Sequence, residues 1–464
     1  MSKRVKELFK NIGFFSIAQL VTRAISFLLL PLYTAYLSTA EYGTIDLVTT
    51  LIQLLLPVFT LSIADAVLRF GISENERADQ ILKIGIRQIN IGILPVMLIC
   101  IGYMIFTKDI ILCAFLIFLY IEEGHISLYA NFSKATGRTR QMTMISILVS
   151  AITIGINVIM IAILKLGLKG YFYALLIGDG AGIILYYYMC DLKNYTGEMN
   201  TAFSPELKKK MLSYSIPLIP NSLFWWINSC LDRWALMLIS GVPVVGIYSV
   251  AYKIPSIIAV VNGIFMQAWN ISLFQNKEEG RKEYFKKVYN HYIEVSFCST
   301  IIIITLSKII ARFGFSGDFF DAWKLIPLLA VAVFFNSTNA FLGSMFTSNN
   351  DTKKIFSTTL VGAVINCLLN YPLIILWGSY GAAAATTISC FVVYIIRVIV
   401  ITRRYGVPFS VAEMMIKVLV LIALTALTML DSIWIAVFSI TGIYCLLYIM
   451  KIVHIKGNKS PKTN

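Results

Sequence analysis

The stretch IGFFSIAQLVTRAISFLLLPLYTA, residues 12–35, is long and apolar enough to cross a membrane as one helix, yet an arginine stands near its middle. A charge at the bilayer centre costs about 2.5–3.5 kcal/mol even on the lenient insertion scale, so Arg23 should not face lipid. The same reasoning applies to Arg233 and Lys253, which lie in later apolar stretches. These three cations should therefore face protein or a water-filled cavity, which favours a membrane protein that moves a solute.

The composition places the whole chain in the membrane class. Hydrophobic residues make up 58% of the 464 residues, charged residues 14%, and the mean hydropathy is +0.78, which excludes a soluble globular protein. Because a spanning helix needs about 20 residues, the sequence predicts an all-α polytopic membrane protein with about 14 transmembrane helices. The expected spans are 12–35, 45–68, 84–106, 110–130, 142–164, 171–190, 212–240, 244–274, 288–311, 324–346, 355–377, 381–401, 411–430 and 432–450.

Basic residues are distributed unevenly between the two sides of these spans. Most of the 39 Lys and Arg residues fall at the two termini and in the connectors on the same side. This is the positive-inside pattern, so we expect a multi-pass protein with both termini in the cytoplasm. The net charge of +15 is therefore a topology signal, and we expect no nucleic-acid partner. The opposite connectors hold only Lys108, Lys165, Lys169, Lys308, Arg312 and Lys324.

A weak internal repeat indicates that the chain contains two copies of one fold. The span 142–164 carries Ser146, Ser150, Thr153 and Asn157, and the span 355–377 carries Thr359, Ala363, Asn366 and Asn370 at the same spacings. Each span is followed by a GxxG turn, at 167–170 and at 378–381. Six spans per copy is an even number, so the repeat is parallel and predicts two six-helix lobes around a central cavity. The expected domains are an N-terminal lobe (1–200), a C-terminal lobe (205–405) and an additional C-terminal helix pair with a tail (406–464).

Polar side chains recur on one face of four of these spans, as expected for the wall of a cavity. In the alternative reading, such residues only tie helices together by hydrogen bonds. Pro217 and Pro220 precede the stripe in 212–240 and predict a kink there. The stripes are Ser16, Gln19, Arg23 and Ser26; Asp46, Thr50, Gln53 and Thr60; Asn221, Ser222, Trp225, Trp226, Asn228, Ser229, Asp232 and Arg233; and Ser249, Lys253, Ser256, Gly263 and Gln267.

The stripes supply the candidate site residues. The planar fork of an arginine suits bidentate contact with phosphate, so Arg23, Arg233 and Lys253 together could offset a diphosphate. Asp65, Asp179 and Asp232 are candidates for H⁺ or Na⁺ coupling. With three candidate anions and three candidate cations, the sign of the net charge of the cavity stays open. We expect no cofactor and no metal, because the Walker motif is absent and the three histidines are scattered. The substrate-binding candidates are Arg23, Arg233, Lys253, Gln19, Asn228 and Trp225.

Three segments resemble a known family of membrane proteins. NIGFFSIAQLVTRAISFLLLPLYTAYLSTAEYGTIDLV (11–48), GVPVVGIYSVAYKIP (241–255) and GSYGAAAAT (378–386) are similar to bacterial O-antigen and capsule flippases. These flippases form the polysaccharide transport branch of the multidrug, oligosaccharidyl-lipid and polysaccharide (MOP) exporter superfamily. The resemblance covers roughly residues 8–400.

The resemblance carries several expectations. It implies that an undecaprenyl-diphosphate-linked oligosaccharide is turned from the cytoplasmic to the outer leaflet of the bacterial inner membrane by alternating access. In the related lipid II flippases, arginines of the first helix and of the second lobe line a cationic cavity. Arg23 and Arg233 match these arginines in placement. The implied partners are the lipid-linked oligosaccharide and the bilayer, with a polysaccharide polymerase and a chain-length regulator as further candidates.

Several other functions stay open. A cation-coupled multidrug exporter and a flippase for lipid II or teichoic-acid precursors share the expected architecture. A polysaccharide polymerase or glycosyltransferase usually needs a sizeable extracytoplasmic loop, whereas the longest connector on that side, near 312–323, is short. We therefore expect a transporter rather than an enzyme. A membrane scaffold is disfavoured by the charges inside the spans.

The substitution Arg23→Ala tests the proposed role of the first cation. If Arg23 holds the substrate diphosphate, the variant should fail to complement a flippase-null strain while its protein level stays normal. Near-normal glycan export by the variant would remove Arg23 from the site.

Overall fold

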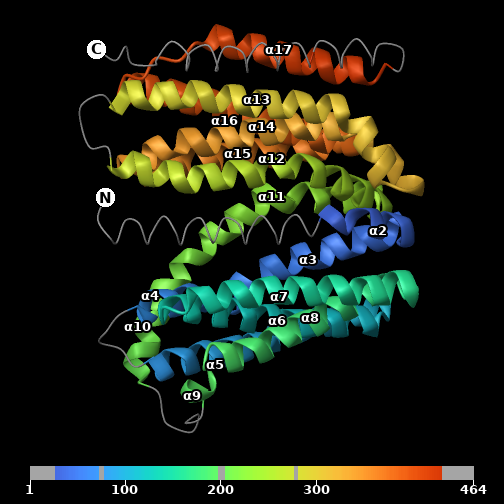
Figure 1. The fold of residues 1–464 in the computed structure, drawn as a ribbon, viewed down its shortest axis with the longest axis vertical. Helices are drawn as coiled ribbons and strands as arrows, with labels where there is room; N and C mark the ends of the chain where they lie inside the picture. The colour runs from blue at the N-terminus through green and yellow to red at the C-terminus, as the bar shows by residue number, and fades with distance from the viewer. Residues whose placement is uncertain (1–26, 73–77, 197–203, 276–280, 431–440, 442–464) are drawn as a thin grey trace, which may run out of the picture. The chain divides into compact units, whose positions relative to one another are not determined.

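The computed structural model describes residues 27–72, 78–196, 204–275, 281–430 and 441. Every regular element in these ranges is a helix, which confirms the all-α polytopic class (Figure 1). The chain divides into two compact units, Met1–Trp234 and Ala235–Asn464, called the first and the second unit below. The three-part division expected from the sequence stays a prediction.

The first unit contains helices α2 to α10 and most of α11. Their bounds are α2 Leu30–Tyr36, α3 Thr39–Phe59, α4 Ile63–Gly71, α5 Ala78–Thr107, α6 Ile110–Ala135, α7 Thr139–Asn157, the π-helix η1 Val158–Ile163, α8 Gly167–Met189, α9 Lys193–Thr196, α10 Pro205–Ser215, the 3₁₀ turn η2 Ile216–Leu218 and α11 Ile219–Ser240, which continues into the second unit.

The second unit contains the remaining described helices, which run side by side in Figure 1. Their bounds are α12 Val242–Gln275, α13 Arg281–Gly314, the 3₁₀ helix η3 Gly317–Lys324, α14 Ile326–Ser348, α15 Thr352–Trp377, α16 Ser379–Tyr405 and α17 Val411–Thr428.

Eleven helices in the described ranges are long and apolar enough to cross a membrane. The protein is therefore a multi-pass membrane protein. α11 is not among the eleven, although it has 22 residues, and it carries Asp232 and Arg233. The expected span 12–35 is described only from residue 27 onward, and the expected span 432–450 is described only at Thr441.

The core of the second unit forms around α14, because this helix is apolar on every side. In its span, 83% of the residues are buried inside the protein. The ring of Phe341 lies at the centre of an aromatic cluster, with ring centroids 5.0 Å from Trp269 and 4.8 Å from Tyr292. The core of the first unit joins α4, α5, α6, α8 and α10 through residues such as Val67, Leu128 and Met211.

The backbone breaks at two places that shape the site. The expected span 45–68 is two helices, because α3 ends at Phe59 and α4 begins at Ile63. Leu61 and Ser62 between them both have positive φ, at 54° and 51°, which is strained for residues other than glycine. The kink expected at Pro217 is confirmed, since the 3₁₀ turn η2 separates α10 from α11.

The GxxG turns of the predicted repeat have matching conformations. Gly167 and Gly378 both have φ of +55°, a value that glycine adopts without strain. At the second glycine of each turn, an added Cβ would lie 3.0 Å from the Met160 carbonyl oxygen in the first unit and 1.9 Å from the Leu373 carbonyl oxygen in the second. Each turn therefore brings a helix against the backbone of the helix before it, and the internal repeat itself stays a prediction.

This packing predicts that Gly381→Ala destabilises the protein. Its methyl group would clash with the backbone of α15, and overpacking costs about 1–3 kcal/mol. Gly155→Ala is the matched control, because a Cβ there meets nothing within 4 Å. Thermal unfolding in detergent, followed by size-exclusion chromatography, should give a lower midpoint for Gly381→Ala only. Equal midpoints for the two variants would contradict the close approach of α15 and α16.

Candidate functional site: the polar seam of α3 and α11

Two tryptophans of α11 converge on one residue of α3. The indole N–H of Trp226 donates to the Thr50 carbonyl oxygen at 2.7 Å, and that of Trp234 donates to the Thr50 hydroxyl at 3.3 Å. The two tryptophans are eight residues apart, so they share one face of α11, and their ring centroids are 6.3 Å apart. Thr50 therefore anchors α11 to α3 within the first unit.

An ion pair lies on the same seam. Arg233 Nε is 3.1 Å from Asp46 Oδ2, and each side chain is 12% exposed. Asp46 stands one helical turn before Thr50, on the same face of α3. The two groups lie at ion-pair distance without the alignment of a hydrogen bond. Each charge thus lowers the cost of burying the other. We call Asp46, Thr50, Trp226, Arg233 and Trp234 the polar seam.

A hollow of about 140 Å³ opens in the same unit where α3 ends. Both stripes predicted in 45–68 and in 212–240 reach it, through Thr60 and Ser222. The strained corner at Leu61 and Ser62 turns the chain so that Asp65 of α4 also lines the hollow. The hollow is large enough for several water molecules. Its polar lining residues are Thr60, Ser62, Asp65, Ser127, Asn131 and Ser222.

The candidate substrate residues have different surroundings. Arg23 and Gln19 lie outside the described residues. Asn228 donates from Nδ2 to the Phe224 carbonyl oxygen at 2.8 Å, one turn earlier in α11. The side chain of Trp225 is 65% exposed, and it is Trp226 and Trp234 whose indoles bind α3. Lys253 lies half-buried on α12 of the second unit.

The candidate coupling carboxylates come from three different helices, α4, α8 and α11. Asp232 is 8% exposed, and its Oδ1 accepts the Arg233 backbone N–H at 2.9 Å. Asp65 lines the hollow, and Asp179 is half-buried on α8. The sequence reasoning missed Glu122 on α6, whose Oε1 would lie 3.5 Å from a Cβ at Gly180, beside Asp179. The only signal for it was a carboxyl pair within an apolar span.

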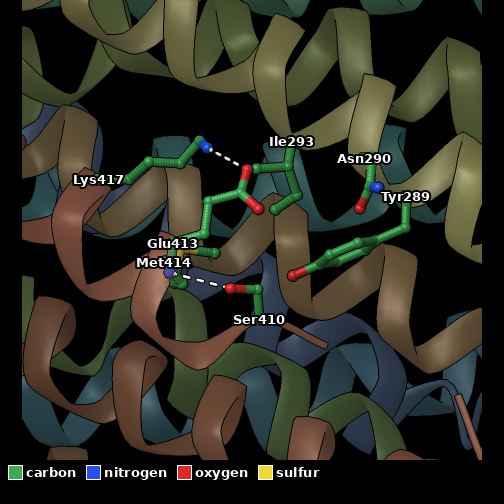
Figure 2. Close-up of a pocket in the computed structure, with 7 residues that line it drawn as sticks. All are labelled: Tyr289, Asn290, Ile293, Ser410, Glu413, Met414 and Lys417. Carbon is green, nitrogen blue, oxygen red and sulfur yellow. Dashed lines mark hydrogen bonds and ion pairs between the residues drawn. The ribbon is translucent and has the colours of Figure 1, made fainter. Parts of the chain in front are cut away.

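The second unit holds a smaller polar pocket between α13 and α17 (Figure 2). Its volume of about 20 Å³ leaves room for about one water molecule, which is too small for an organic substrate. Lys417 Nζ lies 2.8 Å from Glu294 of α13 and 2.8 Å from Glu413 of its own helix. Lys417 therefore joins α17 to α13.

The sequence of the first unit and of the beginning of the second matches a known protein family. A family model described as "Polysaccharide biosynthesis protein" matches residues 8–270, more than half of the chain. An uncharacterised membrane protein of Methanocaldococcus jannaschii is 26% identical over 220 residues, which cover 46% of this chain and 50% of the relative. The chain thus spans about half the length of the curated relative that it matches.

Two solved structures share the fold. The lipid II flippase MurJ in an inward closed conformation superposes with a TM-score of 0.70 at 15% identity, covering 95% of this chain and 99% of that chain. A multidrug resistance transporter of the MATE family, in the MOP superfamily, superposes in its inward-facing conformation with a TM-score of 0.65 at 15% identity, covering 84% and 98%. Identities this low establish the fold alone. The chain therefore has the fold of MOP superfamily transporters.

The buried ion pair leads to a double-mutant prediction. Asp46→Asn or Arg233→Gln alone leaves one buried charge without this partner, which should cost about 3 kcal/mol. The double variant Asp46→Asn/Arg233→Gln carries neither charge and should be destabilised by much less than the sum. Thermal unfolding midpoints of the purified variants in detergent measure this coupling. Simple additivity of the two changes would contradict an energetically significant pair.

Proposed function

Because the chain belongs to the polysaccharide biosynthesis protein family, we propose that it translocates a lipid-linked oligosaccharide across the membrane. The proposed substrate is an undecaprenyl-diphosphate-linked repeat unit that passes from the cytoplasmic to the outer leaflet for surface polysaccharide synthesis. Such a substrate combines a charged diphosphate, a polar glycan and a long apolar tail. A protein that moves it needs a sheltered cation and a polar wall within a helical bundle.

The polar seam is the observation that supports this proposal most directly. Arg233 is a cation of the first unit whose guanidinium is buried against a carboxylate, 3.1 Å away. A phosphate oxygen is chemically equivalent to a carboxylate oxygen as an acceptor for guanidinium, and the arginine fork suits it. A diphosphate can therefore replace Asp46 as the partner of Arg233 without leaving the cation unpaired at any stage.

This exchange gives the ion pair a role in transport. Before the substrate arrives, Asp46 keeps Arg233 neutralised in a medium of low dielectric constant. When the diphosphate takes its place, Asp46 is released and must be solvated or protonated. In the proposed cycle, release of Asp46 and uptake of H⁺ or Na⁺ by Asp65, Asp179 or Asp232 accompany the change between inward- and outward-facing forms. The Arg233–Asp46 pair has no net charge with which to offset that of the diphosphate. Arg23 and Lys253 are therefore the proposed further cations.

The glycan and the lipid tail need different surroundings. Trp226 and Trp234 offer aromatic faces of the kind that stack on sugar rings, while their indole N–H groups stay bonded to Thr50. The polyprenyl tail would stay in the bilayer, so that the protein carries only the polar part of the substrate across. A flippase for lipid II or teichoic-acid precursors would handle the same diphosphate, and the glycan distinguishes the two.

A transport assay with purified protein tests the proposal. Proteoliposomes that contain a fluorescent undecaprenyl-diphosphate oligosaccharide should show flipping by the wild type. Arg233→Ala should lower the initial rate by about 10- to 100-fold, because charge-assisted hydrogen bonds contribute about 1.5–3 kcal/mol. The initial rate of Arg233→Lys should lie between those of the wild type and Arg233→Ala, since lysine binds phosphate only as a point charge.

The control is Arg312→Ala, which removes an exposed arginine at the end of α13 and should leave the rate unchanged. The same liposomes are assayed for efflux of cationic dyes. Dye efflux by the wild type with no flipping of the lipid-linked oligosaccharide would contradict the proposed function and favour drug export.

A further inference from the structure

The short helix α10 is amphipathic and is anchored to the first unit by one face. Leu207, Met211 and Ser215 on this face are 4%, 0% and 0% exposed. Leu207 and Met211 belong to the core that includes Val67 of α4. Tyr214 packs edge-on against Phe70 of α4, with ring centroids 6.0 Å apart. This anchoring fixes which side of α10 faces outward.

A second face of α10 borders a wide hollow, open at the protein surface, with a volume of about 600 Å³ and with described lining residues from this helix and η2 alone. Its six lining residues form two neighbouring lines at helical spacing, 205–208–212–216 and 209–213, and so make one broad stripe along the helix and η2. Three are apolar, two are lysines and none is acidic. They are Pro205, Lys208, Lys209, Leu212, Ser213 and Ile216.

Side chains that line the hollow are more exposed than those of α10 that face the core. Lys209 and Ser213 are exposed, and Ile216 is 45% exposed although it is apolar. Glu206 borders this stripe, since it stands three residues before Lys209, but the lysines at 208–210 together leave this part of α10 with a net positive charge. The hollow is therefore lined by adjacent basic and apolar groups on a rigid support.

α10 lies at one end of the helices of the first unit. α10 packs on α4, which follows the spanning helix α3, and the two lie together in Figure 1. The end of α4 is in contact with the end of α6, since a Cβ at Gly71 would lie 2.8 Å from that of Ala135. Basic residues gather at this end, including Arg69 and Lys134 in the last turns of α4 and α6. Such a basic end is where spanning helices meet anionic headgroups.

We propose that this face of α10 binds an anionic glycerophospholipid from the adjacent leaflet. Lys208 and Lys209 hold the phosphate, and Ile216 packs against the first part of an acyl chain, next to Leu212, which is itself packed against the core of the first unit. A neutral lipid lacks the charge that complements two lysines, and a soluble anion lacks the chain that covers Ile216. The site is independent of the transported substrate, so it stands whether or not the protein moves a lipid-linked oligosaccharide.

Native mass spectrometry of the full chain in detergent measures the binding, with dioleoyl-phosphatidylglycerol and dioleoyl-phosphatidylcholine as probes. The wild type should bind phosphatidylglycerol at least about tenfold more tightly than phosphatidylcholine. Lys208→Gln/Lys209→Gln should weaken phosphatidylglycerol binding by about 30-fold, as expected for two lysines at a membrane surface. Ile216→Ser should weaken the binding of both lipids while the unfolding midpoint stays unchanged, because Ile216 is partly exposed.

Lys353→Gln/Lys354→Gln is the matched control, because it removes two adjacent lysines from the start of α15, outside the hollow. It should change the affinity by less than about threefold. Hydrogen exchange locates the site: phosphatidylglycerol should slow exchange of the amides of 205–216 in the wild type but not in Lys208→Gln/Lys209→Gln. Three results would overturn the proposal. The first is equal effects of the two lysine pairs, and the second is no preference for phosphatidylglycerol. The third is tighter binding of undecaprenyl diphosphate than of phosphatidylglycerol at 205–216.

Discussion

A permanent cation inside a membrane helix must always have a partner, and the pair of Arg233 with Asp46 shows how this chain meets that constraint. The two side chains lie 3.1 Å apart with little exposure, beside two indoles that bind Thr50. Arginine does not lose its proton at accessible pH, so the cation can only exchange partners. The proposed transport cycle follows from that requirement, because a substrate diphosphate is the kind of partner that can replace a carboxylate.

Buried cations in the second unit meet the same constraint in other ways. Lys417 lies between two carboxylates and joins α17 to α13. Arg397 of α16 donates instead to the hydroxyls of Thr358 and Thr359 and to the Asn339 carbonyl oxygen, and so links α14, α15 and α16. These two cations hold helices together. Arg233 differs because its partner comes from a stripe of polar residues that continues to the hollow beside Asp65.

The helical class and most of the spans could be predicted from the sequence, because hydropathy is a local property. Gly167 and Gly378 were also recognisable from their GxxG turns, and the structure gives both the same positive φ. The break at Leu61 and Ser62 could not be predicted, since Pro57 stands inside α3 and the turn falls on residues that rarely adopt positive φ.

The site was predictable in part for a similar reason. Spacing placed Asp46 and Thr50 on one face of a helix and Trp226 and Arg233 on one face of another, but it could not show which residues of different helices would meet. The structure pairs Arg233 with Asp46. The charge of Arg233 alone did not indicate whether its partner is a carboxylate of the protein or a bound ligand. It also selects Trp226 and Trp234 over Trp225, because side-chain direction is set by how α11 packs on α3.

The most direct test of partner exchange at Arg233 is the affinity of the purified protein for undecaprenyl diphosphate with and without the competing carboxylate. If Asp46 and the substrate share Arg233, Asp46→Asn should bind the diphosphate at least about tenfold more tightly than the wild type, because no charged partner has to be displaced. An unchanged or weaker affinity in Asp46→Asn, with the protein folded, would contradict the exchange.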